Sequence, residues 1–136
     1  MIVADANVVA ALYFEGVDTE DARRLLECDG DWLVPELWQH EMLNIAASYA
    51  KFTQTSLARV AVVWEHAAAQ FGSRMRPVNM METLRLAAKS GISAYDAQYV
   101  FLAQELGVWL VTQDKKLRAA VPDRALSLRE ALADLS

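Results

Sequence analysis

Short apolar runs alternate with helix-like patterns along the chain. The apolar runs at 2–4, 32–34 and 109–111 predict strands, and residues 76–78 form a weaker fourth candidate. Apolar residues at helical spacing predict helices at 8–14, 19–28, 35–52, 56–71, 82–89, 94–106, 115–120 and 128–135. Short apolar strands separated by helices are typical of a parallel sheet covered by helices on both faces.

Several residues at the predicted boundaries are typical of helix ends. Thr19 and Ser93 are good N-caps, because a hydroxyl can accept a hydrogen bond from an unpaired amide of the first turn. Pro35 suits the first position of a helix, where its missing N–H costs nothing. Gly91 and Gly107 follow the last apolar positions of their helices and are expected to end them.

Composition is that of a compact globular protein. Of the 136 residues, 54% are hydrophobic and 23% charged, and we find no repeat, linker or low-complexity tract, so we expect one domain over 1–136. The only cysteine, Cys28, cannot form an internal disulfide, which favours a reducing compartment. No secretory signal and no apolar run of about 20 residues is present, so we expect a cytoplasmic protein without a membrane segment.

The net charge of −5 argues against indiscriminate binding to nucleic acid, which needs clustered Lys and Arg. It does not exclude an enzyme that acts on RNA. Acids that hold divalent cations make the formal count more negative than the charge of the loaded protein.

Four of the eighteen acids differ from the others in their surroundings. Asp5 directly follows the apolar run 2–4, and Asp114 follows the run 109–111 after two residues. Both therefore belong to the carboxyl ends of predicted strands, the edge at which open α/β sheets bind their ligands. Glu41 has apolar residues at i−4, i−3 and i+4, and Asp96 has them at i+3, i+4 and i+7, so both are expected to face inward.

Inward-facing carboxylates predict a metal site. An ionised carboxylate in apolar surroundings must be paired, protonated or given a metal ion, and the sequence offers no equal set of inward basic residues. Carboxylate ligands favour hard cations, so we expect Mg²⁺ or Mn²⁺.

Each acid also has a purely structural interpretation, which the sequence leaves open. Asp96 could complete a capping box with Ser93, and Asp114 could cap the helix 115–120. Asp5 could cap the first helix, Asn7 could do so equally well, and Glu41 could pair with an arginine. A capping carboxylate keeps a free oxygen, so the structural and functional interpretations are compatible.

The four acids lie in segments that together resemble the PIN-domain family. These segments are IVADAN (2–7), PELWQHEMLN (35–44), SAYDAQY (93–99) and LVTQDKKL (110–117). Their order and spacing extend over essentially the whole chain. The short length of the chain is similar to that of the VapC-like toxin endoribonucleases of type II toxin–antitoxin systems.

The resemblance implies a fold, an activity and partners. The implied fold is a three-layer α/β/α sandwich with a short, mostly parallel central sheet. The implied activity is metal-dependent hydrolysis of RNA phosphodiester bonds by activated water, neutralised by a cognate antitoxin, in a protein that forms homodimers. Asp5 and Asp96 would be the principal metal ligands, Glu41 and Asp114 would complete the catalytic cluster, and Asn7 and Thr112 would support it.

Two basic residues are candidates for binding substrate. Lys115 and Lys116 directly follow Asp114 and could bind RNA phosphates, although a solvated helix face explains them equally well.

Two other functions remain open from the sequence. One is a non-catalytic PIN-like module that binds RNA or protein, which a broken acid set would favour. The other is a receiver-like phosphoacceptor domain, which normally has adjacent acids after its first strand, whereas residues 4–7 read Ala-Asp-Ala-Asn. His40, His66 and Cys28 are separated from suitable partners, so a catalytic triad or a zinc site is not expected.

Overall fold

The computed structural model describes residues 1–135 and contains a five-stranded sheet. The strands are β1 (Ile2–Ala4), β2 (Trp32–Pro35), β3 (Met75–Arg76), β4 (Leu110–Val111) and β5 (Ala125–Leu126), in the order β3-β2-β1-β4-β5. Every neighbouring pair is parallel, so the carboxyl ends of all five strands lie along one edge. The predicted short parallel sheet is confirmed.

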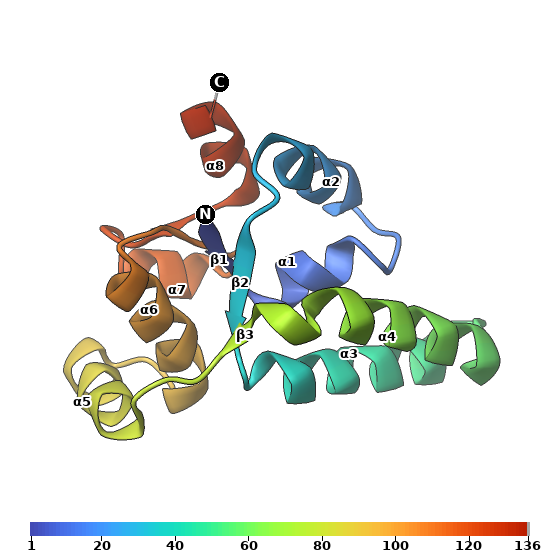
Figure 1. Ribbon diagram of the computed structural model, residues 1–136, viewed down its shortest axis with the longest axis horizontal. Coiled ribbons are helices and arrows are strands. Elements are labelled where there is room, and N and C mark those ends of the chain that lie inside the picture. The colour runs from blue at the N-terminus through green and yellow to red at the C-terminus, as the bar shows by residue number, and fades with distance from the viewer. Residues whose placement is uncertain (136) are drawn as a thin grey trace.

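Helices cover both faces of this sheet. They are α1 (Ala6–Ala11), α2 (Thr19–Cys28), α3 (Trp38–Phe52), α4 (Leu57–Phe71), α5 (Met80–Ser90), α6 (Ala94–Leu106), α7 (Lys115–Ala120) and α8 (Leu128–Leu135), with a 3₁₀ turn, η1, at Gly72–Arg74. In Figure 1, α5 and α6 lie on one side of the strands and α1, α3 and α4 on the other. The molecule is therefore an α/β/α sandwich.

The strands are apolar throughout because they are covered on both faces. All residues of β1, β2 and β4 are buried, so their side chains do not alternate between core and solvent. Trp32 and Trp38 are among the largest fully buried side chains. In the described part of the chain, no helix is both long and apolar enough to cross a membrane.

The start of α3 differs from the sequence prediction. Pro35 is the buried last residue of β2 rather than the first residue of a helix, and α3 begins at Trp38. Pro35 pairs with Arg76 of β3, and the next amide, that of Glu36, donates to the Arg76 carbonyl at 3.1 Å. Pro35 tolerates this position because the ladder uses the amide that follows it rather than its own nitrogen.

Three other helix starts also differ, and α5 begins at Met80 rather than at 82 because Asn79 caps it. The N-cap of α2 is Asp18, without a side-chain cap bond, and Thr19 is the first helical residue. The buried Thr19 hydroxyl instead accepts a bond from the Gly16 amide at 2.9 Å and so closes the preceding loop. The first helix spans Ala6–Ala11 rather than 8–14, because Asp5 caps it directly at the end of β1.

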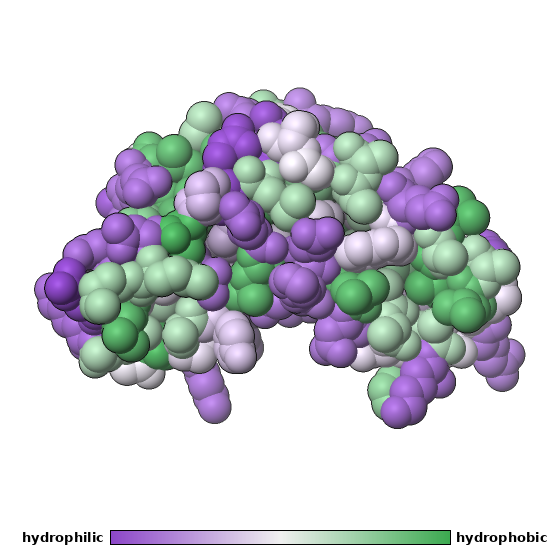
Figure 2. Space-filling model, turned by 60° about the horizontal axis from the view of Figure 1, so that its bottom comes forward, coloured by the Kyte–Doolittle hydropathy of each residue, from purple (hydrophilic) through white to green (hydrophobic). Residues whose placement is uncertain are grey.

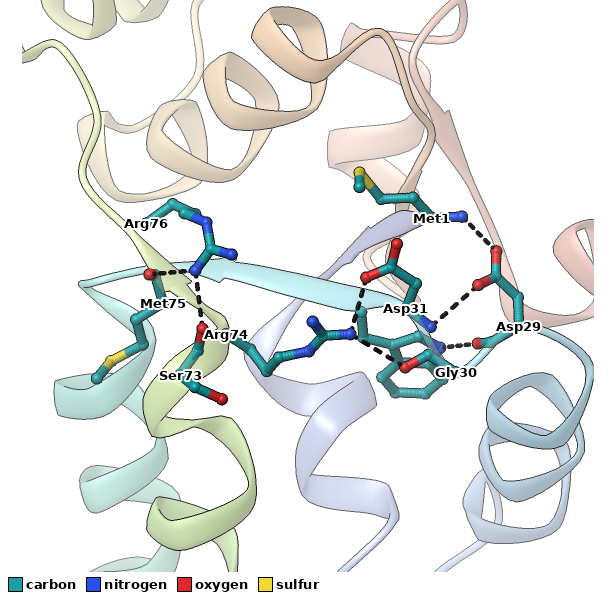
Figure 3. A network of polar contacts seen from close by, with 9 residues as sticks. Met1, Asp29, Gly30, Asp31, Ser73, Arg74, Met75 and Arg76 are labelled. Carbon is teal, nitrogen blue, oxygen red and sulfur yellow. Dashed lines mark hydrogen bonds and ion pairs between the residues drawn. The ribbon is translucent and has the colours of Figure 1, made fainter.

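A polar network closes the amino-terminal edge of the sheet, as Figure 3 shows. The Met1 amine pairs with Asp29 Oδ2 at 2.7 Å, and Arg74 pairs with Asp31 Oδ1 at 2.7 Å. The second Asp29 oxygen accepts a bond from the Asp31 amide at 3.1 Å. Ion pairs therefore stabilise the amino-terminal edge of the sheet. Asp5, Glu41, Asp96 and Asp114 lie at the opposite, carboxyl edge.

Candidate functional site

Asp5 and Asp114 meet at the carboxyl edge because their strands are neighbours. β1 pairs with β4 in parallel, with Ala4 beside Val111, so the residues that follow the two strands emerge together. Asp5 lies directly after β1, and Asp114 is the N-cap of α7 after β4.

Glu41 and Asp96 reach the same place from helices on opposite sides of the sheet. Glu41 lies in the first turn of α3, and Asp96 lies in the first turn of α6. With Asp5 and Asp114 they line one cavity of about 680 Å³. Figure 2 shows a hollow with hydrophilic residues at its centre, between two lobes that carry hydrophobic surface.

Thr112 is bonded to two of the acids. It is fully buried, and its hydroxyl donates to Asp5 Oδ2 at 2.6 Å and accepts from the Asp114 amide at 3.1 Å. The other Asp5 oxygen, Oδ1, accepts from the Ala6 amide at 2.7 Å. Asp5 is therefore fixed at both oxygens.

The structural interpretations of Asp5 and Asp114 as helix caps hold alongside their place in the cavity. Asp5 caps α1, and Asp114 caps α7 by accepting from the Leu117 amide at 3.0 Å. At α6 the cap is Ser93, whose hydroxyl accepts from the Asp96 amide at 3.0 Å. Glu41 does not pair with an arginine, and within residues 1–135 none of the four acids forms a salt bridge.

Burial and mutual repulsion disfavour charge on three of these carboxyls. Burial raises the pKa of Asp5, the charges of Asp96 and Asp114 raise it further, and the bonds from Thr112 and Ala6 oppose the rise.

The same two effects act on Glu41 and Asp96. Burial raises the pKa of Glu41, and the charges of Asp5 and Asp96 raise it further. The nearby Tyr99 hydroxyl opposes this rise. Burial, followed by the charge of Asp114, raises the pKa of Asp96. The carboxyls are therefore close enough to destabilise one another's charge.

Sequence reasoning overlooked the hydroxyl of Tyr99. This residue is only 1% exposed, and its hydroxyl is buried beside Glu41. Neither the hydroxyl nor Glu41 Oε1 has a partner in hydrogen-bond geometry among residues 1–135. The sequence indicates only that Tyr99 is an apolar position at i+3 from Asp96, because spacing alone does not show where a hydroxyl points.

The chemistry of the cluster suits a hard cation. All four candidate ligands are carboxylates, no cation of the described chain pairs with them, and Glu41 keeps a buried oxygen without a partner. Within residues 1–135, however, no three acidic, histidine or cysteine side chains are arranged to hold one ion directly. Direct ligation therefore requires side-chain rotations towards a common point.

The other predicted residues differ in their relation to the cavity. Asn7 is exposed and lines it. Lys115 and Lys116 are exposed on the first turn of α7 and do not line it. Three polar residues without a predicted role do line it: His40 and Asn44 of α3, and Tyr95 of α6, which is 64% exposed.

With four acids at the edge of a short parallel sheet, the site can be set beside known protein families. The profile described as PIN domain matches residues 2–121. The chain belongs to the PIN-domain family. It is 28% identical over 129 residues to Ribonuclease VapC3 of Pyrobaculum aerophilum, an alignment that covers 89% of this chain and 95% of that protein. The predicted resemblance to VapC ribonucleases is confirmed.

Further comparisons agree with the family assignment. The PIN-domain chain is 47% identical to Exonuclease VapC9 of Pyrobaculum aerophilum over 38 residues. This alignment covers 28% of this chain and 29% of that protein. Its fold is similar to the crystal structure of PAE2754 from Pyrobaculum aerophilum, with a TM-score of 0.77 and 22% identity over 98% of this chain and 88% of that one. It is also similar to the crystal structure of FitAcB from Neisseria gonorrhoeae, with a TM-score of 0.70 and 17% identity over 95% of this chain and 99% of that one. The α/β/α fold prediction is therefore confirmed.

Proposed function

We propose that this PIN-domain protein is a metal-dependent endoribonuclease that hydrolyses phosphodiester bonds at the cavity of Asp5, Glu41, Asp96 and Asp114. The observation that carries the proposal is the convergence of four carboxylates from separate elements on one cavity, without a salt bridge to any of them in the described chain. The similarity to Ribonuclease VapC3 supports RNA as the substrate.

The cluster is suited to bind Mg²⁺ or Mn²⁺, with Asp5 and Asp96 as the principal ligands and Glu41 and Asp114 completing the set. When bound, such an ion supplies positive charge and Lewis acidity towards a phosphodiester. Asp5 is held in place for this role by the bonds from Thr112 and Ala6.

The residues of the chain itself would orient the nucleophile. Glu41 lines the cavity, and its carboxylate would position an attacking water. Asp114 is exposed at the cavity, its Oδ1 caps α7, and its Oδ2 accepts no hydrogen bond from residues 1–135. Asn7 would support the site, and Lys115 and Lys116 would bind flanking phosphates of the RNA.

The test is cleavage of an end-labelled single-stranded RNA by the purified chain with Mg²⁺ or Mn²⁺. Asp96→Asn and Asp5→Asn should abolish cleavage while circular dichroism shows an intact fold. Asp134→Asn, an exposed acid on α8, is the matched control and should cleave normally. Full activity in excess EDTA would reject the metal role, and RNA binding without cleavage would favour the non-catalytic module.

The receiver-like alternative receives no support from the topology. Flavodoxin-like receiver folds have the strand order 2-1-3-4-5, whereas this sheet has the order 3-2-1-4-5. Acetyl phosphate should therefore not phosphorylate this protein.

We also propose that the protein is a toxin neutralised by a cognate antitoxin, and that it forms a homodimer. The support is its similarity to VapC proteins, together with an apolar groove of about 220 Å³ between α3 and α4 that apolar side chains of a partner could enter. Induced expression should arrest growth, and Asp96→Asn should relieve the arrest. Sedimentation of the purified chain as a monomer would contradict the dimer.

A further inference from the structure

Beneath the acidic cavity lies a pair of buried polar atoms to which the proposed chemistry assigns no role. Tyr99 lies on α6, one turn after Asp96, and its side chain is buried in the core. Its hydroxyl and Glu41 Oε1 lack a partner in hydrogen-bond geometry among residues 1–135. Because buried polar atoms are nearly always hydrogen-bonded in folded proteins, these two atoms on neighbouring side chains require an explanation.

Glu41 is held less firmly than two of the other acids. Asp5 accepts bonds at both of its oxygens, from Thr112 and Ala6, and Asp114 is fixed by the cap of α7. Glu41 has a longer side chain with more rotatable bonds and forms no ion pair with another described residue. Of the groups around it, the Tyr99 hydroxyl can donate a hydrogen bond from the core side.

We propose that the Tyr99 hydroxyl donates to Oε1 of Glu41 and thereby fixes the side-chain rotamer in which Oε2 faces the cavity. Each atom would then supply the partner that the other lacks among residues 1–135. Tyr99 is then a positioning residue, since it acts on substrate and cation only through Glu41. Its importance for metal binding rests on the proposed function, whereas the hydrogen bond itself does not.

A double-mutant cycle without metal tests the bond directly. Tyr99→Phe keeps the ring but removes the donor, and Glu41→Met keeps the chain length but removes both oxygens. We expect Tyr99→Phe to lower the urea midpoint clearly in the wild-type background and much less in the Glu41→Met background. An equal shift in the two backgrounds, or no loss of midpoint in the wild type, would overturn the proposal.

Tyr13→Phe is the matched control for this cycle. The Tyr13 hydroxyl also has a side-chain partner, Gln70, but it lies outside the acidic cavity. Its effect on the urea midpoint should therefore be the same with and without Glu41→Met.

Proton NMR of the wild-type protein and of Glu41→Met gives a second measurement if Tyr99→Phe does not fold. We expect a slowly exchanging Tyr99 hydroxyl proton whose resonance moves in Glu41→Met. A resonance that is unchanged in that variant would overturn the proposal.

Binding of Mn²⁺, followed by electron paramagnetic resonance, tests the positioning role. Tyr99→Phe should weaken Mn²⁺ binding by about tenfold, the effect typical of residues that orient a metal ligand, and Tyr13→Phe should leave it unchanged. Wild-type affinity in Tyr99→Phe would show that Tyr99 does not position a ligand. If the wild type binds no Mn²⁺, the proposed metal site fails, and the urea cycle and the NMR measurement still decide whether the bond exists.

Discussion

At the scale of single residues, Thr112 connects two acids that different strands bring to the cavity. Its hydroxyl is bonded both to the Asp5 carboxylate and to the Asp114 amide. Removing this hydroxyl should therefore misplace one of the proposed metal ligands, Asp5, and loosen the loop that carries another, Asp114.

Thr112→Val should reduce RNA cleavage at least tenfold, because groups that orient metal ligands typically contribute about 10–100-fold. The unfolding free energy should fall by roughly 1–3 kcal/mol, the cost of a lost bond to a charged group. Thr83→Val is the matched control: Thr83 is also buried, but its hydroxyl donates to the Asn79 carbonyl, away from the acids. Equal cleavage by Thr112→Val and Thr83→Val would contradict the supporting role.

The raised pKa values predict an inverted pH dependence of stability. Asp5, Glu41 and Asp96 bind protons more tightly in the folded than in the unfolded chain. As the pH rises above the ordinary values of 3.8 for aspartate and 4.5 for glutamate, the unfolded chain ionises first, so these three groups increasingly lower the folding stability. Metal-free protein should therefore have a higher urea midpoint at pH 5 than at pH 7.

For two carboxyls with lowered pKa values, Asp29 and Glu130, the contribution to folding stability changes with pH in the opposite direction. Their stabilising contribution is present above the ordinary values and is lost only as the pH falls below them, so it does not change between pH 5 and pH 7. The difference between the two midpoints should shrink in the double variant Asp5→Asn/Asp96→Asn. A lower midpoint at pH 5 than at pH 7 in the wild type would contradict this account.

The four acids of the cavity could be predicted from the sequence, whereas two of the other residues around them could not. Asp5 and Asp114 follow apolar runs, and parallel strands bring such positions to one edge whatever their distance in the chain. The Tyr99 hydroxyl and His40 depend on side-chain direction, which the spacing of apolar residues does not specify.

At the scale of elements, α6 carries Asp96 towards the cavity and needs a sharp end before β4. Gly107 provides it with φ = 66°, in the left-handed region that other residues rarely adopt. The predicted helix end is correct because only glycine takes this conformation without a steric penalty.

Gly107→Ala should lower the unfolding free energy by about 1–2 kcal/mol, the cost of a Cβ in the left-handed conformation. Gly72→Ala is the matched control: Gly72 also follows a helix, but its φ is −55° and an added Cβ would have nothing within 4 Å. That variant should be neutral or slightly more stable. Chemical denaturation of both variants measures the difference, and equal midpoints would disprove the role of the left-handed turn.

Elements that depend on distant pairing were the least predictable. Pro35 looked like a helix start, but pairing with β3 makes it the end of a strand. β5 has only two residues and exists because β4 lies beside it, so no local periodicity could reveal it. By contrast, α7 and α8 match their predicted ranges because their end signals are local.

At the scale of the whole molecule, the fold places paired charges at one edge of the sheet and acids without salt bridges at the other. The amino-terminal edge of the sheet is closed by ion pairs, such as that between Arg74 and Asp31. The carboxyl edge gathers four acids around a cavity without such pairs in the described chain. The stability lost to this arrangement should be restored when a cation binds, because binding to the folded state alone stabilises it.

Titration calorimetry of Mn²⁺ into the metal-free protein at pH 7 tests this central claim most directly. The account predicts binding by the wild type and by Asp134→Asn, and at least tenfold weaker binding by Asp5→Asn and Asp96→Asn. Mn²⁺ binding of equal strength in all four proteins, or no binding by the wild type, would contradict it.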